Sequence, residues 1–217
     1  MTSVDQPFDA SWQTITIWAL LLVAACYVIA DLGARVVLSK DASPKDKITF
    51  IWLAFDGLIH ACVELPFIIC STGGRTVNTS TGILAAMWRD YARADARWGT
   101  ADPTIVSIEL LTVFFCGPLC FYILYLMTQR NPSRHFWLVV LCSAELYGVW
   151  MTFAPDFLQG AVNLVLHPKA ILLFWIYNLG MNALWVVFPV YLLFASYGEI
   201  SKSLRLTHAK QTAAKSR

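Results

Sequence analysis

Three ionisable residues, Asp56, His60 and Glu64, follow one another at four-residue intervals within the apolar stretch ITFIWLAFDGLIHACVELPFIIC. Residues four apart lie on one side of an α-helix, so the three side chains share a stripe. A carboxylate one turn from an imidazole suits general acid–base chemistry. Because charge in hydrocarbon is costly, such residues normally face a protein interior or a wet cavity. The stripe therefore predicts an acid–base site inside a membrane protein.

Three further apolar stretches carry polar side chains near their middles. These side chains are Glu109 with Thr112, Glu145 with Tyr147, and Asn182 with Trp185. Polar groups at mid-depth in four separate stretches predict a common cavity, in which the Trp185 ring could stabilise a cation lying over its face. The competing interpretation is that these groups, His60 included, form hydrogen bonds that hold helices together.

Metal binding is the rival use of His60, Glu64 and Glu109. The sequence contains no HExxH and no dense cluster of ligand residues, so it predicts no metal site. The six cysteines include no CxxC pair. Cys116 and Cys120 are four apart but have no companion pair nearby, and we expect the cysteines to be small, buried hydrophobic side chains.

The elements that must position these residues are long apolar segments. The chain is 58% hydrophobic and 14% charged, against roughly 45–50% and 25% in soluble domains. Five segments approach the roughly 20 residues that cross a bilayer: Thr14–Leu38, Ile48–Cys70, Pro103–Thr128, His135–Phe153 and Ala170–Tyr197. Continuous apolar runs exclude the alternating pattern of a barrel. We predict an all-α membrane protein with five transmembrane helices around an intramembrane ligand cavity. The net charge of +2 gives no indication of nucleic-acid binding.

The two ends of the chain differ in charge. Residues 1–13 form a polar tail with Asp5 and Asp9 but no Lys or Arg, so the first apolar segment is interpreted as a retained anchor rather than a cleaved signal peptide. Residues 14–200 form the membrane domain, and residues 201–217 form a basic, frayed tail. That tail either contacts anionic headgroups or is simply solvated.

Lys and Arg are unevenly shared between the two sides of a five-span topology. Eleven lie on the side of the C-terminus and five on the other, the latter being Arg75, Arg89, Arg93, Arg97 and Lys169. The positive-inside rule then predicts a cytosolic C-terminus and a luminal N-terminus. Asn78-Thr79-Ser80 is a glycosylation sequon on the luminal side of this topology.

Residues 71–102 form a long connection between two spans. STGGRTVNTSTG is typical of a loop. ILAAMWRDYARADARW predicts a short amphipathic helix that carries Trp88, Tyr91 and Trp98. This helix would either lie at the membrane interface or cap the cavity.

Several stretches together resemble the emopamil-binding protein family, which comprises the Δ8–Δ7 sterol isomerases of the wider EXPERA membrane domain. The stretches are GLIHACVE, WRDYARADARW, SIELLTVFFCGP, LYG and MNALWVVFP, in matching order from about Trp52 to Tyr197. The co-occurrence of HxxxE, WxxYxxxDxR, ExxTxxxxGP and NALWxxxP is specific, although each pattern alone is not. The resemblance implies five membrane helices around a sterol pocket, an endoplasmic reticulum location, and no metal or organic cofactor. It also implies a ring double bond moved by protonation, a carbocation and deprotonation.

Carried over residue by residue, the resemblance assigns His60, Glu64 and Glu109 to the acid–base group. Thr112, Asn182 and Trp185 match pocket-lining residues, and Trp185 would face the cation. The resemblance does not say which carboxylate donates the proton and which accepts it.

The chain also departs from the family pattern. Asp56 stands where a small or neutral residue is usual, Glu145 where Gln is usual, and Trp98 where Tyr is usual; Ala94 and Ala96 replace Gly and Ser. We expect Asp56, Glu145, Tyr147 and Trp98 to contact the substrate as well. Two additional carboxylates would alter the protons held in the pocket.

Three functions remain open at this point. The first is an intramembrane isomerase that shifts a sterol double bond from Δ8 to Δ7. The second is a related isomerase of another steroid or polycyclic terpenoid in a specialised pathway. The third is a non-catalytic binder of sterols or amphiphiles, as in the sigma-2 receptor branch of the same domain. All three predict that hydrophobic amines bind, because a protonated amine mimics the carbocation. The sequence leaves open whether the chain forms a homodimer.

Overall fold

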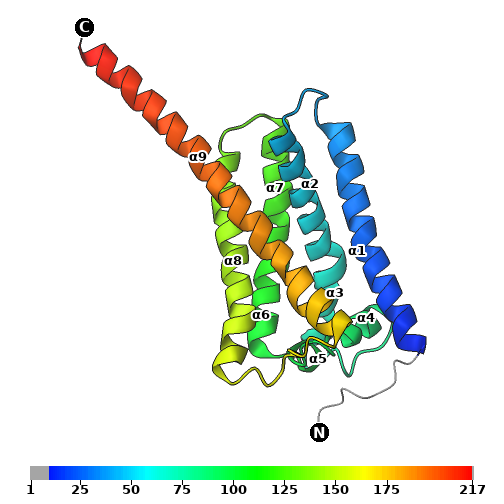
Figure 1. The fold of residues 1–217 in the computed structure, drawn as a ribbon. Coiled ribbons are helices and arrows are strands. Elements are labelled where there is room, and N and C mark those ends of the chain that lie inside the picture. Colours follow the sequence, from blue (N-terminus) through cyan, green and yellow to red (C-terminus); the bar gives the residue numbers. More distant parts are fainter. Residues whose placement is uncertain (1–9, 217) are drawn as a thin grey trace.

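The structure is a computed structural model that describes residues 10–216. Five helical segments in it are long and apolar enough to cross a membrane, and they stand together as a bundle (Figure 1). Their bounds are Trp12–Val37, Pro44–Ser71, Pro103–Thr128, Arg134–Leu158 and Ile171–Lys215. The described residues form no strand, only an isolated backbone bridge between Asp95 and Leu164. The predicted all-α architecture with five spans is confirmed.

Two spans, α1 (Ala10–Val37) and α8 (Arg134–Leu158), are single α-helices, whereas the other three contain π-helical turns. The second span consists of α2 (Pro44–Ile59), η1 (His60–Glu64) and α3 (Leu65–Ser71). The third consists of α6 (Pro103–Leu111), η2 (Thr112–Cys116) and α7 (Gly117–Thr128). The fifth consists of η3 (Ile171–Met181) and α9 (Asn182–Lys215).

Proline explains the first two π-helices. Pro66 and Pro118 each stand in the first turn of the α-helix that follows. Because proline has no N–H, the carbonyl four residues earlier loses its partner, and hydrogen bonds to the fifth residue back take over, from Leu65 to His60 and from Gly117 to Thr112. Such π-turns often occur at functional sites.

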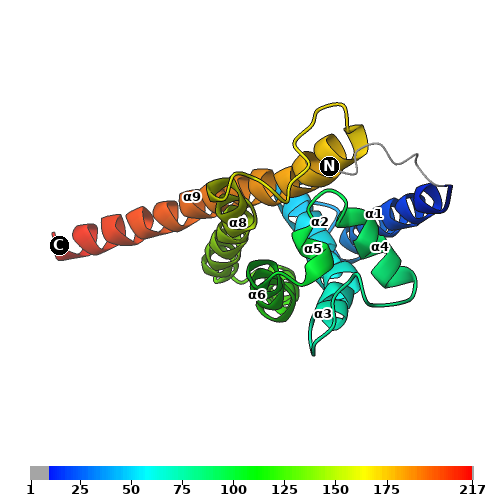
Figure 2. The same cartoon turned by 90° about the horizontal axis from the view of Figure 1, so that it is seen from below.

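The connection between the second and third spans lies across one end of the bundle (Figure 2). Instead of the single amphipathic helix expected there, it forms α4 (Ile83–Tyr91) and α5 (Arg97–Thr100), separated by turns. The interruption has a tertiary cause. The backbone of Ala94 and Ala96 is hydrogen-bonded to residues 163–165, and the Asp95 carboxylate accepts from the Arg97 backbone and guanidinium.

Asp90 joins three elements at this end of the bundle. Its side chain is fully buried and accepts hydrogen bonds from Thr16 of α1 and from Tyr177 of η3, the latter at 2.7 Å. Arg93 of the same segment contacts the other carboxylate oxygen at 2.8 Å. The connecting segment is therefore fixed to both the first and the fifth spans.

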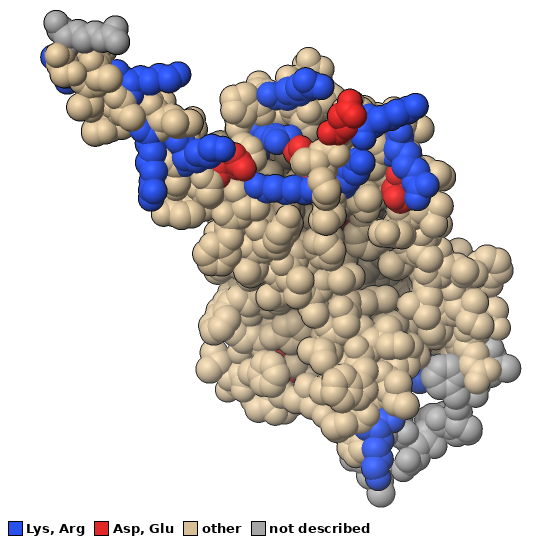
Figure 3. Space-filling view, turned by 45° about the horizontal axis from the view of Figure 1, so that its top comes forward, with Lys and Arg blue, Asp and Glu red and all other residues tan. Residues whose placement is uncertain are grey.

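Lys and Arg side chains gather at the end of the bundle where α1 ends and α2 begins, above a broad surface band without visible charge (Figure 3). From this end α9 projects beyond the bundle (Figure 1). The expectation of a frayed tail from residue 201 is wrong for residues 201–215, which continue α9 as helix. These residues include no Gly or Pro and are rich in Ala, Lys and Leu, which are good helix formers.

Candidate active site

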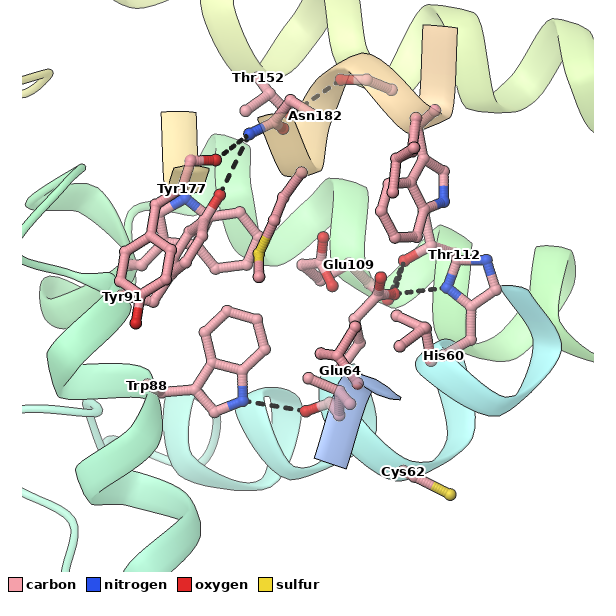
Figure 4. Close-up of a pocket in the computed structure, with 18 of the residues that line it drawn as sticks. His60, Cys62, Glu64, Trp88, Tyr91, Glu109, Thr112, Thr152, Tyr177 and Asn182 are labelled. Atoms are coloured by element: carbon pink, nitrogen blue, oxygen red, sulfur yellow. Dashed lines mark hydrogen bonds and ion pairs between the residues drawn. The ribbon is translucent and has the colours of Figure 1, made fainter. Parts of the chain in front are cut away.

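A cavity of about 1250 Å³, including the part that opens to the outside, lies inside the bundle. All five spans line it, and α4 and α5 close one side with aromatic residues. Each span and α4 contribute lining residues, for example Leu22, Ile59, Trp88, Glu109, Glu145 and Trp185. A mostly apolar wall with a few convergent polar groups is typical of a small-molecule site, and Figure 4 shows how these groups are arranged.

His60, Glu64 and Thr112 form a hydrogen-bonded group at the cavity wall (Figure 4). Nδ1 of His60 lies 2.5 Å from Oε2 of Glu64. The Thr112 hydroxyl donates to the same oxygen at 3.0 Å. Because His60 and Glu64 lie at the two ends of η1 and Thr112 begins η2, the two π-turns meet at this carboxylate.

Glu109 of α6 lies beside Glu64 and lines the same cavity. Its side chain is buried, and its Oε2 has no hydrogen-bond partner among the described residues. Glu64, by contrast, accepts from two side chains. Two neighbouring carboxyl groups with such different hydrogen bonding can take different roles in a proton transfer.

Asp56 lies behind this wall. It is fully buried and is not among the residues that line the cavity, so the expected contact with substrate is not found. One of its oxygens accepts from Nε1 of Trp185 at 2.8 Å and lies 3.3 Å from Nε2 of His60. The other accepts from the Cys120 thiol at 3.2 Å. Asp56 thus holds two cavity-lining rings from behind.

The opposite end of the cavity is aromatic. Trp88 and Trp98 stack with ring centroids 4.9 Å apart, and Trp88 donates to the Val63 carbonyl. The Tyr91 hydroxyl accepts from Nδ2 of Asn182 at 3.2 Å. Burial raises the pKa of the Tyr91 phenol, so this hydroxyl stays protonated.

The structure brings eight of the ten predicted site residues to the cavity wall. They are His60, Glu64, Trp98, Glu109, Thr112, Glu145, Asn182 and Trp185. Asp56 lies behind the wall, and the prediction for Tyr147 is wrong. Tyr147 is 60% exposed on the outer face of α8, because residues two apart on a helix point in nearly opposite directions and Glu145 faces inward.

Sequence reasoning missed other residues of the site. Tyr177 and Thr152 line the cavity, and Cys120 contacts Asp56. Gly117 was also missed, although it lets two π-turns approach closely: a Cβ there would lie 3.0 Å from Cβ of His60. A signal was present, because Gly117 and Pro118 directly follow the apolar stretch that carries Glu109 and Thr112.

Comparison with known proteins places the chain in a family. The family model described as EXPERA (EXPanded EBP superfamily) matches residues 83–196, which is more than half of the chain. The chain belongs to the EXPERA family. The EXPERA segment runs from α4 into α9, so it includes Glu109, Thr112 and Trp185, whereas His60 and Glu64 precede it.

Individual relatives cover most of the chain at low identity. A probable 3-beta-hydroxysteroid-Delta(8),Delta(7)-isomerase from Oryza sativa subsp. japonica is 28% identical over 84% of this chain and 78% of its own length. A 3-beta-hydroxysteroid-Delta(8),Delta(7)-isomerase from Cavia porcellus is 27% identical over 88% of this chain and 81% of its own. An isomeliandiol synthase from Melia azedarach is 26% identical over 70% of this chain and 68% of its own length.

Proposed function

We propose that the chain is an intramembrane isomerase that shifts a ring double bond of a sterol from Δ8 to Δ7. The observation that carries this proposal is the pair Glu64 and Glu109 on one wall of an apolar cavity. Relatives named as Δ8–Δ7 isomerases support the reaction class. A sterol is almost entirely apolar, so its rings suit a cavity whose polar groups are confined to a few places.

The hydrogen bonds favour one assignment of roles. Glu109 carries an oxygen without a partner, and as the carboxylic acid it can give its proton to C9 of the Δ8 double bond. The positive charge then lies on C8. Glu64, whose carboxylate is oriented by His60 and Thr112, removes a proton from C7, and the electrons of that C–H bond form the Δ7 double bond. Transfer of the proton from Glu64 back to Glu109 resets the site, so no proton is gained or lost overall.

The cation between the two proton transfers needs stabilisation away from water. Trp185 lines the cavity, and an aromatic face contributes about 2 kcal/mol or more to a desolvated cation. The ionised Glu109 left by the first step adds a nearby negative charge. A hydrophobic amine in its protonated form would use the same contacts and should compete with substrate.

A second candidate is a related isomerase with another polycyclic terpenoid as substrate. Two observations favour it specifically. Buried Asp56 and Glu145 add carboxyl groups beside His60, and the relatives include an isomeliandiol synthase and a protoglabretal synthase from Citrus sinensis. A different substrate skeleton would then be accommodated by the same acid–base wall.

Expression of the full chain in a host that lacks its own Δ8–Δ7 isomerase tests the proposal. Sterol profiling should detect Δ7 sterols at the expense of Δ8 sterols, and the Glu109→Gln variant should not produce them. Accumulation of unchanged Δ8 sterols with wild-type protein present in the membrane would contradict the sterol assignment. Conversion of supplied triterpenoids in that case would establish the second candidate, and sterol binding without any product would indicate a binder.

The same host tests the proposed placement in the endoplasmic reticulum with a luminal N-terminus. Asn78 is exposed in the connection between the second and third spans, which this topology places in the lumen. A glycan on Asn78, detected as a mobility shift that Asn78→Gln removes, would establish the topology. Glycosylation of a sequon added after residue 217 instead would reverse it.

A further inference from the structure

Four side chains of different chemistry converge in the cavity wall, with His60 and Glu145 lining the cavity and Asp56 and Cys120 behind them. Asp56 of α2, His60 of η1, Cys120 of α7 and Glu145 of α8 each offer one atom able to bind a metal ion, and these atoms all lie within 4.8 Å of one another. All four residues are buried, none more than 2% exposed. Ligand atoms around a tetrahedral metal ion lie about 3.5 Å apart, so modest side-chain rotations would close the cluster around an ion.

Polar atoms in this cluster lack well-formed hydrogen bonds. Both carboxyl oxygens of Glu145 are buried without one among the described residues, and Nε2 of His60 lies 3.3 Å from Oδ1 of Asp56 without forming one. Leaving a buried polar atom unpaired costs about 1–3 kcal/mol, and more for a charged group. Glu145 and His60 each also offer a ligand atom within 4.8 Å of those of Asp56 and Cys120, and buried atoms without well-formed hydrogen bonds are available to bind an ion.

The charges around the cavity also favour a cation. Four carboxyl groups lie on or directly behind its wall, and among the residues that the structure describes the basic side chain beside them is the imidazole of His60. The residues that line the cavity include no Lys or Arg. Buried charge needs compensation by an opposite charge or by protonation, and a divalent ion would compensate the carboxylates nearest to it.

The surrounding hydrogen bonds orient the four candidate ligands. Nδ1 of His60 contacts Glu64, which leaves Nε2 for a metal ion in the carboxylate–histidine–metal arrangement found at many sites. Trp185 donates to Asp56. The ligand set of one nitrogen, one sulfur and two carboxylates matches the preferences of Zn²⁺.

We propose that Asp56, His60, Cys120 and Glu145 form a zinc site in the wall of the cavity. The site is distinct from the pair Glu64 and Glu109, and the proposal does not depend on the chain being an isomerase. A zinc ion on Nε2 would fix His60 with its Nδ1–H directed at Glu64. The metal would thereby position the acid–base group.

Metal analysis of the purified full chain tests the site directly. The chain, extracted in detergent without chelators from cells supplied with Zn²⁺, should contain about one tightly bound zinc ion per molecule. Replacement by Co²⁺ should give the visible bands of a tetrahedral site together with a thiolate-to-metal band in the near ultraviolet. Cys120→Ser should abolish the thiolate band, whereas Cys26→Ser, at a buried cysteine outside the cluster, should retain it.

Glu145→Gln provides a second variant of nearly unchanged shape. It should lower the Zn²⁺ affinity at least tenfold while the protein elutes as a single species of wild-type size. Wild-type protein with no more metal than Cys120→Ser, and no thiolate band after addition of Co²⁺, would overturn the proposal. In that outcome the four side chains share protons instead, and the isomerase proposal is unaffected because its sterol profile is measured separately.

Discussion

The indole N–H of Trp185 donates to Oδ1 of Asp56 at 2.8 Å, so an aromatic ring that lines the cavity is held by a carboxylate behind it. The same carboxylate oxygen lies 3.3 Å from Nε2 of His60. Asp56 therefore connects two side chains of the cavity wall that come from different spans. Its position one turn before His60, on the stripe evident from the sequence, makes this connection possible.

We expect Asp56 and Trp185 to be strongly coupled in stability. A hydrogen bond to a charged group contributes about 1.5–3 kcal/mol, so Asp56→Leu and Trp185→Phe should each lower the free energy of unfolding. The double variant should lose less than the sum of the two, by an interaction energy in that range. Unfolding in mixed micelles measures the free energies of wild type, the two single variants and the double variant. Strictly additive losses would show that the contact contributes nothing to stability.

Glu109→Gln should lower turnover by at least about 100-fold, since loss of a general acid typically costs 10²–10⁴ in rate. Gln has the shape of Glu, so the fold should be retained. Glu64→Gln should have an effect of similar size through loss of the base. Product formation with Δ8 sterol in detergent or vesicles measures both. If each variant keeps wild-type turnover, the assignment of acid and base is wrong.

Tyr91→Phe should raise KM about two- to tenfold, whereas Tyr147→Phe should leave it unchanged. The Tyr91 hydroxyl accepts from Asn182 at the cavity, and a lost hydrogen bond there costs about 0.5–1.5 kcal/mol. Tyr147→Phe removes the same hydroxyl from an exposed side chain on the outer face of α8, away from the cavity. Steady-state kinetics of the two variants measures the difference, and equal effects would place the cavity elsewhere.

Asp90→Asn should destabilise the protein without changing the acid–base group. Asp90 accepts from Thr16 and Tyr177 and pairs with Arg93, and its side chain is fully buried. We expect a loss of about 2 kcal/mol, which lowers the melting temperature by roughly 4–8 °C in a chain of this size. Differential scanning fluorimetry measures this shift in melting temperature. An unchanged melting temperature would mean that these contacts do not hold α4 to the bundle.

Much of the site could be predicted because charge and hydrocarbon are incompatible. Glu64, Glu109, Glu145 and Asn182 stand in otherwise apolar helices, so they had to face inward, and they line one cavity. Tyr147 lacks this constraint. An aromatic ring is compatible with lipid, so nothing forces it to face inward. Tyr147 is two residues from Glu145, which places it on the opposite face of the helix.

Other features depended on contacts between distant segments, which periodicity does not reveal. The turns at residues 92–96 follow from hydrogen bonds to residues 163–165, and a local pattern of hydrophobic residues continues through them. The cluster of Asp56, His60, Cys120 and Glu145 combines four elements. Two of its members, Asp56 and Cys120, are separated by 64 residues, so no local sequence pattern indicates that they meet.

Gly117→Ala should impair the acid–base group by displacing His60. A Cβ at Gly117 would lie 3.0 Å from Cβ of His60, tighter than nearly all real contacts of a Cβ. Each Cβ is attached directly to a helix backbone, which resists movement. Forcing the helices apart costs about 1–3 kcal/mol. The shift should also separate Nδ1 of His60 from Glu64, and a misplacement of about 1 Å can cost up to 100-fold in rate.

Gly33→Ala is the matched control for this variant. Gly33 also lies within a helix, α1, but a Cβ there meets only Phe50 at 3.9 Å. Since Ala favours a helix over Gly by up to about 1 kcal/mol, this variant should be as stable as wild type or more so, with normal turnover. Melting temperatures and kcat distinguish the two, and normal turnover in Gly117→Ala would show that the site tolerates movement of His60.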